Sequence, residues 1–203
     1  MMAKLMGLLL LGIIRALTGA QARWQGCPPK AEQRIYFANH QSHADLVLMS
    51  AALPEELRSI TRPIAAKDYW TKTPFKKWIT TAVFNAIYVD RVKTGEQDPL
   101  EPLINALASG DSIILFPEGT RGNQEEPQKF KSGLYNLAQK FPDVVLVPAW
   151  INNVQRVMPK GEVVPVPILC SVTFGVPIAL GLEENRADFL TRAREAVLAL
   201  RQS

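Results

Sequence analysis

The chain has 203 residues, of which 47% are apolar and 21% are charged, and its formal net charge is +4. This length supports one well-buried core and is too short for two domains of ordinary size. The two cysteines, Cys27 and Cys170, form neither a disulfide framework nor a metal-binding spacing, so we expect a reducing, cytoplasmic compartment. The absence of any recognisable nucleic-acid module argues against a nucleic-acid partner.

Residues 1–31 carry four basic residues and no acidic one, which suits an anionic surface such as lipid headgroups. Leu5 to Ile14 is an unbroken run of apolar residues and glycine. As a helix this run would rise about 15 Å, roughly half the hydrocarbon thickness of a bilayer. Lys4 and Arg15 would share one side of it, which is typical of a helix lying in the membrane interface. We therefore assign residues 1–24 to membrane association, peripheral or monotopic, at the cytoplasmic face of the cell membrane.

Two other interpretations of the N-terminal segment remain open. A basic start, an apolar run and Ala20-Gln21-Ala22 also form the pattern of a secretory signal peptide with its cleavage site. Alternatively, the helix is buried in the core of the protein. N-terminal sequencing of the purified protein tells the signal peptide from the membrane anchor, because a chain that starts at Gln21 or Arg23 would exclude the anchor.

Strand-like and helix-like segments alternate along the rest of the chain. Strands are expected at 34–38, 60–66, 86–89, 112–116, 144–150 and 168–174, and helices at 46–53, 98–110, 132–140 and 183–201. Pro63 predicts that the second of these strands is an edge or irregular strand. The alternation predicts an α/β fold: a single layered domain, residues 25–203, with a mainly parallel or mixed sheet flanked by helices, beside the N-terminal interface helix.

Residues 67–78 interleave four lysines with aromatic side chains. One interpretation is a surface for membrane headgroups or for the acyl donor of a lipid enzyme. The other is a core helix, because Phe75, Ile79 and Ala82 recur at helical spacing. We expect Phe75 in the core and keep the surface interpretation for Tyr69 and Trp70.

Both histidines of the chain lie between Asn39 and Asp45, where a predicted strand leads into a predicted helix. Turns of this kind lie at the edge of an α/β sheet where ligands bind. If the helix starts after His40, with Ser42 as its N-cap, Asp45 can bond one imidazole nitrogen while the other accepts a proton. His40 is the predicted general base and Asp45 its orienter, while His43 is expected to be structural or to face the substrate.

Two alternatives compete for these residues. Ser42-x-x-Asp45 is a variant of a capping box, so the carboxylate could serve only the helix end; both roles are compatible if different carboxylate oxygens serve them. His40, His43 and Asp45 could instead be ligands of a metal-dependent hydrolase. Such sites need three or four protein ligands, and the chain has no further histidine, so we expect no bound metal.

The second informative stretch is Phe116 to Gly122, Phe-Pro-Glu-Gly-Thr-Arg-Gly. Its glycines allow the backbone to approach a ligand closely, and Arg121 offers the fork geometry that grips a phosphate. Arg91 follows another predicted strand, and Lys131 can add a point charge to the same anion. These three cations predict a site for an anionic headgroup.

Together these stretches resemble the glycerolipid acyltransferase family, most closely the 1-acyl-glycerol-3-phosphate acyltransferases. The resemblance runs from about residue 35 to residue 180, and the shared blocks appear in the order of the family: Asn39 to Asp45, Asn85 to Arg91, Phe116 to Gly122, Val145 to Ala149, and Phe174 to Ile178.

The resemblance implies transfer of an acyl group from acyl-CoA or acyl carrier protein to the free sn-2 hydroxyl of 1-acyl-glycerol 3-phosphate, giving phosphatidic acid in phospholipid biosynthesis. It implies a lysophospholipid acceptor, the acyl donor and a membrane surface as partners, with no bound cofactor. His40 and Asp45 are then catalytic, and the acceptor is bound by Arg91, Glu118, Gly119, Thr120, Arg121 and Lys131. Alternatives are another acceptor, such as an ornithine lipid precursor or glycerol 3-phosphate, and a non-catalytic lipid-binding protein.

Overall fold

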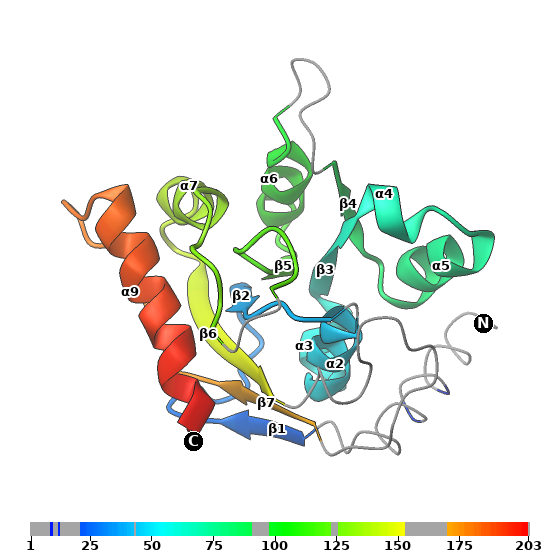
Figure 1. Cartoon of the computed structure of the whole chain (residues 1–203), viewed down its shortest axis with the longest axis horizontal. Coiled ribbons are helices and arrows are strands. Elements are labelled where there is room, and N and C mark those ends of the chain that lie inside the picture. Colours follow the sequence, from blue (N-terminus) through cyan, green and yellow to red (C-terminus); the bar gives the residue numbers. More distant parts are fainter. Residues whose placement is uncertain are drawn as a thin grey trace.

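The computed structural model describes residues 9, 12, 21–42, 44–90, 98–122, 126–152 and 170–202. The strands in these ranges form one seven-stranded sheet (Figure 1). Their spatial order is β1 (Gln21–Trp24), β7 (Ser171–Phe174), β6 (Val145–Asn152), β2 (Arg34–Ala38), β5 (Ser112–Leu115), β3 (Thr61–Ala66) and β4 (Ile87–Val89). The strands from β6 to β4 are parallel, whereas β7 is antiparallel to β6 and parallel to β1. The predicted α/β fold with a mainly parallel, mixed sheet is confirmed.

Helices connect most of the strands, as the alternating pattern predicts. In chain order the described helices are α2 (Asp45–Ala52), α3 (Glu55–Ser59), α4 (Lys67–Trp70), α5 (Pro74–Trp78), the π-helix η1 (Ile79–Val83), α6 (Glu101–Ala108), α7 (Gly133–Lys140), α9 (Arg186–Ala199) and the 3₁₀-helix η2 (Leu200–Gln202).

Side chains of the central strands alternate between two apolar layers, one on each face of the sheet. In β2, Tyr36 lies in one layer with Leu48 and Met49 of α2. Its neighbours Ile35 and Phe37 lie in the other layer, which is closed by α6, α7 and α9. All five residues of β2 are buried, as expected for a parallel strand covered on both faces. Figure 1 shows the same arrangement, with α2 and α9 on different sides of the sheet.

Of the two predictions made for the strand that contains Pro63, the edge strand is wrong and the irregular strand agrees with the structure of β3. It lies between β5 and β4. It pairs with β5 through Thr61, Arg62 and Pro63 and with β4 through residues 64–66. Each neighbour therefore uses a different half of the strand, and Pro63, which has no N–H to donate, lies where the pairing changes sides.

The N-terminal segment predicted for membrane association lies largely outside the described residues. Of the run from Leu5 to Ile14, the structure describes only Leu9 and Gly12. Residues 21–24, which we assigned to the same segment, form β1 and pair with β7. The sheet therefore begins before residue 25. None of the helices in the described ranges is long and apolar enough to cross a membrane.

The expectation that Phe75 lies in the core is wrong, because its side chain is 68% exposed. The helix that starts at Pro74 does not continue in regular α-helical form. At Ile79 it becomes a π-helix, in which the N–H of Phe84 donates to the carbonyl of Ile79 at 3.2 Å. Ile79 packs against the core, whereas the ring of Phe75, one turn earlier, stacks on Trp78 and stays exposed.

Candidate active site

The candidate site lies at the edge of the sheet where the parallel strands end. β2, β5, β3 and β4 are neighbours and run in one direction. Their ends therefore release four segments at the same edge. His40 follows β2, Phe116 follows β5, Lys67 follows β3 and Asp90 follows β4. The structure thus brings together sequence blocks that lie far apart along the chain.

His40 and Asp45 form the pair that the sequence predicts. Nδ1 of His40 lies 2.8 Å from Oδ2 of Asp45. The carboxylate is buried, with 1% of its side chain exposed, whereas the imidazole is 20% exposed. A carboxylate accepts hydrogen bonds, so it fixes the proton on Nδ1. Nε2 is then the nitrogen that can accept a proton.

The same carboxylate oxygen also holds the turn between β2 and α2. Oδ2 of Asp45 accepts the backbone N–H groups of Gln41 at 2.7 Å and of Ser42 at 2.9 Å. Orientation of the histidine and closure of the turn are therefore served by one oxygen, not by two as the sequence led us to expect. Oδ1 is buried and has no hydrogen-bond partner among the described residues.

The predicted N-cap at Ser42 is wrong. Helix α2 begins at Asp45, and its N-cap residue is Ala44, which makes no side-chain capping bond. The hydroxyl of Ser42 accepts the N–H of Ala44 at 3.2 Å instead. The carboxylate of Asp45 lies in the first turn of the helix, where the positive end of the helix dipole favours a negative charge.

Glu118 fixes the backbone of the histidine from the opposite side. Its Oε1 accepts the N–H of His40 at 2.7 Å, and its Oε2 accepts the N–H of Gln128 at 2.8 Å. The N–H of Gly122 in turn donates to the carbonyl of His40 at 2.8 Å. Burial raises the pKa of the Glu118 carboxyl, and the bonds from Gln128 and His40 oppose that change. The histidine turn and the Phe116 to Gly122 loop are thereby joined into one unit.

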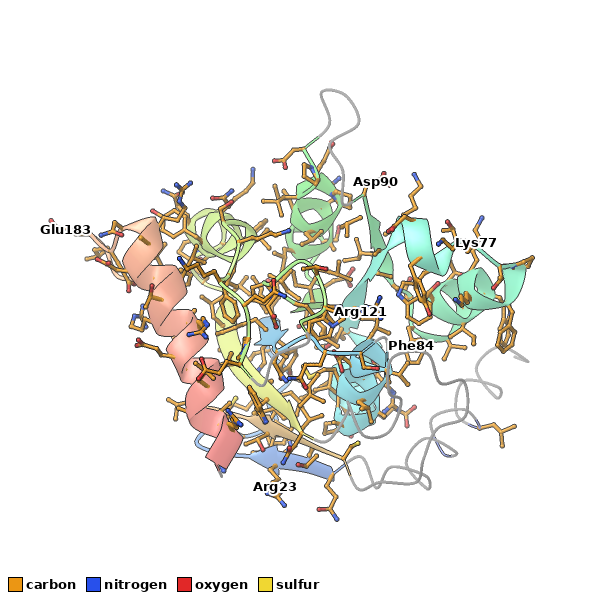
Figure 2. All side chains as sticks on the ribbon, viewed as in Figure 1. Arg23, Lys77, Phe84, Asp90, Arg121 and Glu183 are labelled. Atoms are coloured by element: carbon orange, nitrogen blue, oxygen red, sulfur yellow. The ribbon has the colours of Figure 1, made fainter. Side chains whose placement is uncertain are left out.

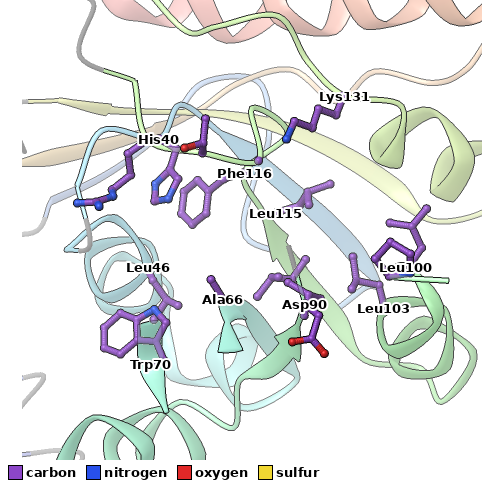
Figure 3. A pocket seen from close by; sticks show the side chains of 16 residues that line it. His40, Leu46, Ala66, Trp70, Asp90, Leu100, Leu103, Leu115, Phe116 and Lys131 are labelled. Atoms are coloured by element: carbon purple, nitrogen blue, oxygen red, sulfur yellow. The ribbon is translucent and has the colours of Figure 1, made fainter. Parts of the chain in front are cut away.

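The pocket in front of His40 has a volume of about 270 Å³. The imidazole stacks on the ring of Phe116, with centroids 4.4 Å apart. Figure 3 shows these two rings on the same side of the pocket as Lys131, with Trp70 on the opposite side. Much of the lining is apolar and comes from the strands, α2 and α6: Leu46, Ile64, Ala66, Val89, Leu100, Leu103 and Leu115. A base, a cationic wall and an apolar space thus share one cavity.

The cationic wall is built by Arg121 and Lys131, which both line the pocket. Gly119 makes room for the lysine. Its φ is +68°, a conformation that costs glycine little. A Cβ atom at this position would lie 2.7 Å from Nζ of Lys131. The chain there is folded so that the ammonium lies directly over the turn, beside Thr120, which also lines the pocket.

Most of the predicted site residues therefore meet at one place. His40, Gly119, Thr120, Arg121 and Lys131 line the pocket, Asp45 lies behind the histidine, and Glu118 lies beneath the loop. Arg91 and His43, for which roles were also predicted, lie outside the described residues.

Three residues contribute in ways the sequence did not reveal. The side-chain amide of Asn39 is buried and bonds both the carbonyl and the N–H of Ile151, which ties the histidine turn to β6. Phe116 supports the imidazole face, and Asp90 lines the pocket at its outer side. The only sequence signal for them is position, since each directly follows a predicted strand or belongs to a motif.

The described residues contain no group of three or more His, Cys, Asp or Glu side chains arranged to hold a metal ion. His40 and Asp45, two of the three ligands that the metal-hydrolase alternative needs, bond each other instead. These two side chains therefore form a hydrogen-bonded pair that can accept a proton, and not part of a set of metal ligands.

Comparison with known proteins gives consistent results. A protein-family model described as "Acyltransferase" matches residues 25–152. The chain is 29% identical over 165 residues to 1-acyl-sn-glycerol-3-phosphate acyltransferase alpha of Homo sapiens, covering 78% of this chain and 55% of that protein. It is 28% identical over 179 residues to a 1-acyl-sn-glycerol-3-phosphate acyltransferase of Chlamydomonas reinhardtii, covering 85% and 50%. The chain thus spans about half the length of these two relatives.

Two further similarities cover more of the matched protein. The lyso-ornithine lipid O-acyltransferase of Brucella abortus is 23% identical over 213 aligned residues, which cover 88% of this chain and 73% of that protein. Among solved structures, the 1-acyl-sn-glycerophosphate acyltransferase PlsC of Thermotoga maritima superposes with a TM-score of 0.71 at 22% identity, covering 93% of this chain and 75% of that one. At this identity the structural likeness shows a shared fold.

Proposed function

We propose, from the premise that the chain belongs to the acyltransferase family, that it transfers an acyl group from a thioester to the free hydroxyl of a lyso-lipid. The observation that carries this proposal is the contact of 2.8 Å between His40 and Asp45 at the wall of the pocket. This pair can accept a proton from a substrate hydroxyl and requires no nucleophile from the protein.

The reaction begins when Nε2 of His40 takes the proton of the acceptor hydroxyl. The hydroxyl oxygen attacks the thioester carbonyl carbon and forms a C–O bond, and the carbonyl oxygen becomes an oxyanion that backbone N–H groups stabilise. Asp45 stabilises the imidazolium that forms. Collapse of the oxyanion breaks the C–S bond, and the leaving thiolate receives the proton from the imidazolium. The products are an ester and a free thiol, and the histidine is neutral again.

The preferred acceptor is 1-acyl-glycerol 3-phosphate, and the product is phosphatidic acid. Arg121 and Lys131 supply the charge and the donors that a phosphate monoester needs at the rim of the pocket. We assign Arg91 to the same anion. Glu118 and Gly119 serve the acceptor by holding the loop in place, because both oxygens of Glu118 already accept backbone N–H groups. The apolar lining suits an acyl chain.

The donor is acyl-CoA or acyl carrier protein, and the proposed chemistry needs no metal and no bound cofactor. Both donors are anionic, so the lysines beside the pocket suit either. We further propose that residues 1–24 hold the protein peripherally on the cytoplasmic face of a membrane, where both substrates are found.

A second acceptor is suggested by the relative that matches over most of its own length. The Brucella abortus protein acts on a lyso-ornithine lipid by its name, and such a headgroup carries an amine. Asp90 lines the pocket with 53% of its side chain exposed, and its Oδ2 lies 3.4 Å from Nζ of Lys67, so its carboxylate already faces one ammonium group and could exchange it for that of a lipid. Transfer to an amine-bearing lyso-lipid is therefore the alternative to transfer to lysophosphatidic acid.

The test gives the purified protein labelled acyl-CoA or acyl carrier protein with lysophosphatidic acid, lyso-ornithine lipid or glycerol 3-phosphate. Phosphatidic acid is expected as the main product. His40→Ala is expected to lose about 10²- to 10⁴-fold in rate, the usual contribution of a general base. Asn185→Ala, at the N-cap of α9 and not in the lining of the pocket, is the control and is expected to keep most of the activity.

Three outcomes would count against the proposal. Equal rates for His40→Ala and the wild type would remove His40 from its role. A preference for the lyso-ornithine lipid would mean that this lipid, and not lysophosphatidic acid, is the acceptor, and would leave the proposed chemistry unchanged. Tight lipid binding without any turnover would indicate a lipid-binding protein.

A further inference from the structure

The segment between β3 and β4 presents aromatic side chains to solvent. On helix α5, Phe75 is 68% exposed and Trp78 is 37% exposed. The two rings stack with centroids 6.4 Å apart and planes at 22°. Large apolar side chains that are exposed side by side mark an interaction site more often than single exposed residues do.

Lysines surround this aromatic pair. Lys72 lies in the turn before α5, and Lys76 and Lys77 lie on the helix itself. Lys72 and Lys77 are exposed, while Nζ of Lys76 lies 3.9 Å from the ring centroid of Tyr69. Figure 2 shows Lys77 on the side of α5 that faces away from the sheet. We call Lys72, Phe75, Lys76, Lys77 and Trp78 together the α4–α5 surface.

The opposite side of the same segment belongs to the core and to the active site. Ile79 and Val83 of η1 and Trp70 of α4 pack against the core. Trp70 also lines the pocket in front of His40. The segment that carries the α4–α5 surface therefore also contributes one side chain to the pocket, and Figure 1 shows this segment beside β3 and β4.

We propose that the α4–α5 surface docks on an anionic phospholipid membrane. Exposed Phe and Trp rings insert at the boundary between headgroups and acyl chains, and neighbouring lysines extend to the phosphates. An acidic protein would match the lysines as well, but it would leave the stacked pair of rings without an apolar partner. A bilayer satisfies both halves of the surface. The docked orientation places the Trp70 wall of the pocket at the membrane, where a lyso-lipid with its acyl chain can enter.

Binding of the full chain to vesicles tests the proposal without any use of turnover. Vesicles of phosphatidylcholine mixed with phosphatidylglycerol are compared with vesicles of phosphatidylcholine alone. Lys72→Gln with Lys77→Gln is expected to weaken partitioning onto the anionic vesicles about fivefold per lysine, about 25-fold together, with little change on the neutral ones. The matched control, Lys129→Gln with Lys140→Gln, removes two exposed lysines outside both this surface and the basic N-terminal segment and is expected to change partitioning far less.

A second measurement asks whether this surface itself enters the membrane. Both native cysteines are buried, so a single Phe75→Cys replacement can carry an environment-sensitive dye. Its emission is expected to shift to shorter wavelengths when anionic vesicles are added. The same dye on Leu182→Cys, another exposed apolar position, is the control and is expected to show no shift.

The vesicle and dye measurements test membrane docking independently of enzyme activity. Only the entry route for the lyso-lipid rests on the proposed function. A dye at position 75 that does not respond while the protein binds vesicles would overturn the proposal. So would a response to acidic acyl carrier protein and not to vesicles. Vesicle binding and dye emission are read without turnover, so absent turnover in all proteins would refute the enzyme and leave the vesicle result standing.

Discussion

Replacing Asp45 by Asn removes one charge and leaves the shape of the side chain unchanged. In the native protein Oδ2 accepts three N–H groups: that of the His40 ring and the backbone groups of Gln41 and Ser42. An amide oxygen can still accept bonds, but without charge. If the new NH₂ group turns toward the ring, it donates to Nδ1 and forces the proton onto Nε2. The nitrogen that has to accept the substrate proton would then be occupied.

The Asp45→Asn replacement is expected to lower both the stability of the fold and the rate of the reaction, by different amounts. Hydrogen bonds to a charged acceptor contribute about 1.5–3 kcal/mol and those between neutral groups about 0.5–1.5 kcal/mol. Weakening three bonds by about 1 kcal/mol each is offset in part because a buried charge is removed, so we expect a net loss of about 1–2 kcal/mol in the free energy of unfolding. For a chain of this length the melting temperature falls by about 2–4 °C per kcal/mol. The rate of acyl transfer is expected to fall much more, by about 10²- to 10⁴-fold.

The assay compares kcat per folded molecule with thermal unfolding for Asp45→Asn and for a matched control. Asn185→Ala removes a side-chain cap at the start of α9, where Oδ1 of Asn185 accepts the N–H of Asp188 at 3.0 Å. It is expected to cost about 1 kcal/mol of stability and to leave kcat unchanged.

One result would refute the reasoning. If Asp45→Asn and Asn185→Ala lose similar stability and both keep full kcat, the aspartate serves only the end of its helix and does not orient the base.

Three further predictions concern the loop that faces His40. Burial raises the pKa of Glu118 above its ordinary value of 4.5, so the folded protein loses stability as the pH rises through the raised pKa and the carboxyl loses its proton. In urea unfolding, the wild type should therefore lose its stability advantage over Glu118→Gln between about pH 4.5 and neutrality. An advantage that grows with pH would contradict this. Gly119→Ala would place a Cβ atom 2.7 Å from Nζ of Lys131, so the lysine has to move. We expect KM for the acceptor to rise and the free energy of unfolding to fall by about 1 kcal/mol. Gly110→Ala, at φ +88° with open space around it, is the control and should lower stability alone. Arg121→Lys keeps the charge but loses the two-pronged grip, so KM for a phosphate-bearing acceptor should rise about tenfold with KM for acyl-CoA nearly unchanged; equal changes in both constants would place Arg121 elsewhere.

The sequence predicts the site well because the site is made of strand ends. Apolar runs identify the strands before His40 and before Phe116, and parallel strands bring the residues at their carboxyl ends to one edge of the sheet.

Features that depend on local geometry or on distant pairing escaped prediction. Phe75 lies one regular turn before Ile79 and has helical spacing with it, but it stacks on the exposed Trp78 and not on the core, and residue type alone does not show where the core ends along a helix. Ser42 resembles a cap, yet its hydroxyl accepts only the N–H of Ala44 in the turn before the helix, and the helix begins later, at Asp45. Strand β1 pairs with β7, which lies far from it along the chain, and no local pattern reveals that pairing.

The bonds that Glu118 makes have a consequence for which hydroxyl of a lipid is used. His40 is attached to the anion loop by its own main chain, through Glu118 on one side and Gly122 on the other. The main-chain positions of His40 and of the loop that carries Arg121 are therefore fixed relative to each other by the buried side chain of Glu118 and by one backbone bond. If the acceptor's phosphate binds Arg121, this fixed spacing selects the hydroxyl to be acylated by the number of carbon atoms between it and the phosphate.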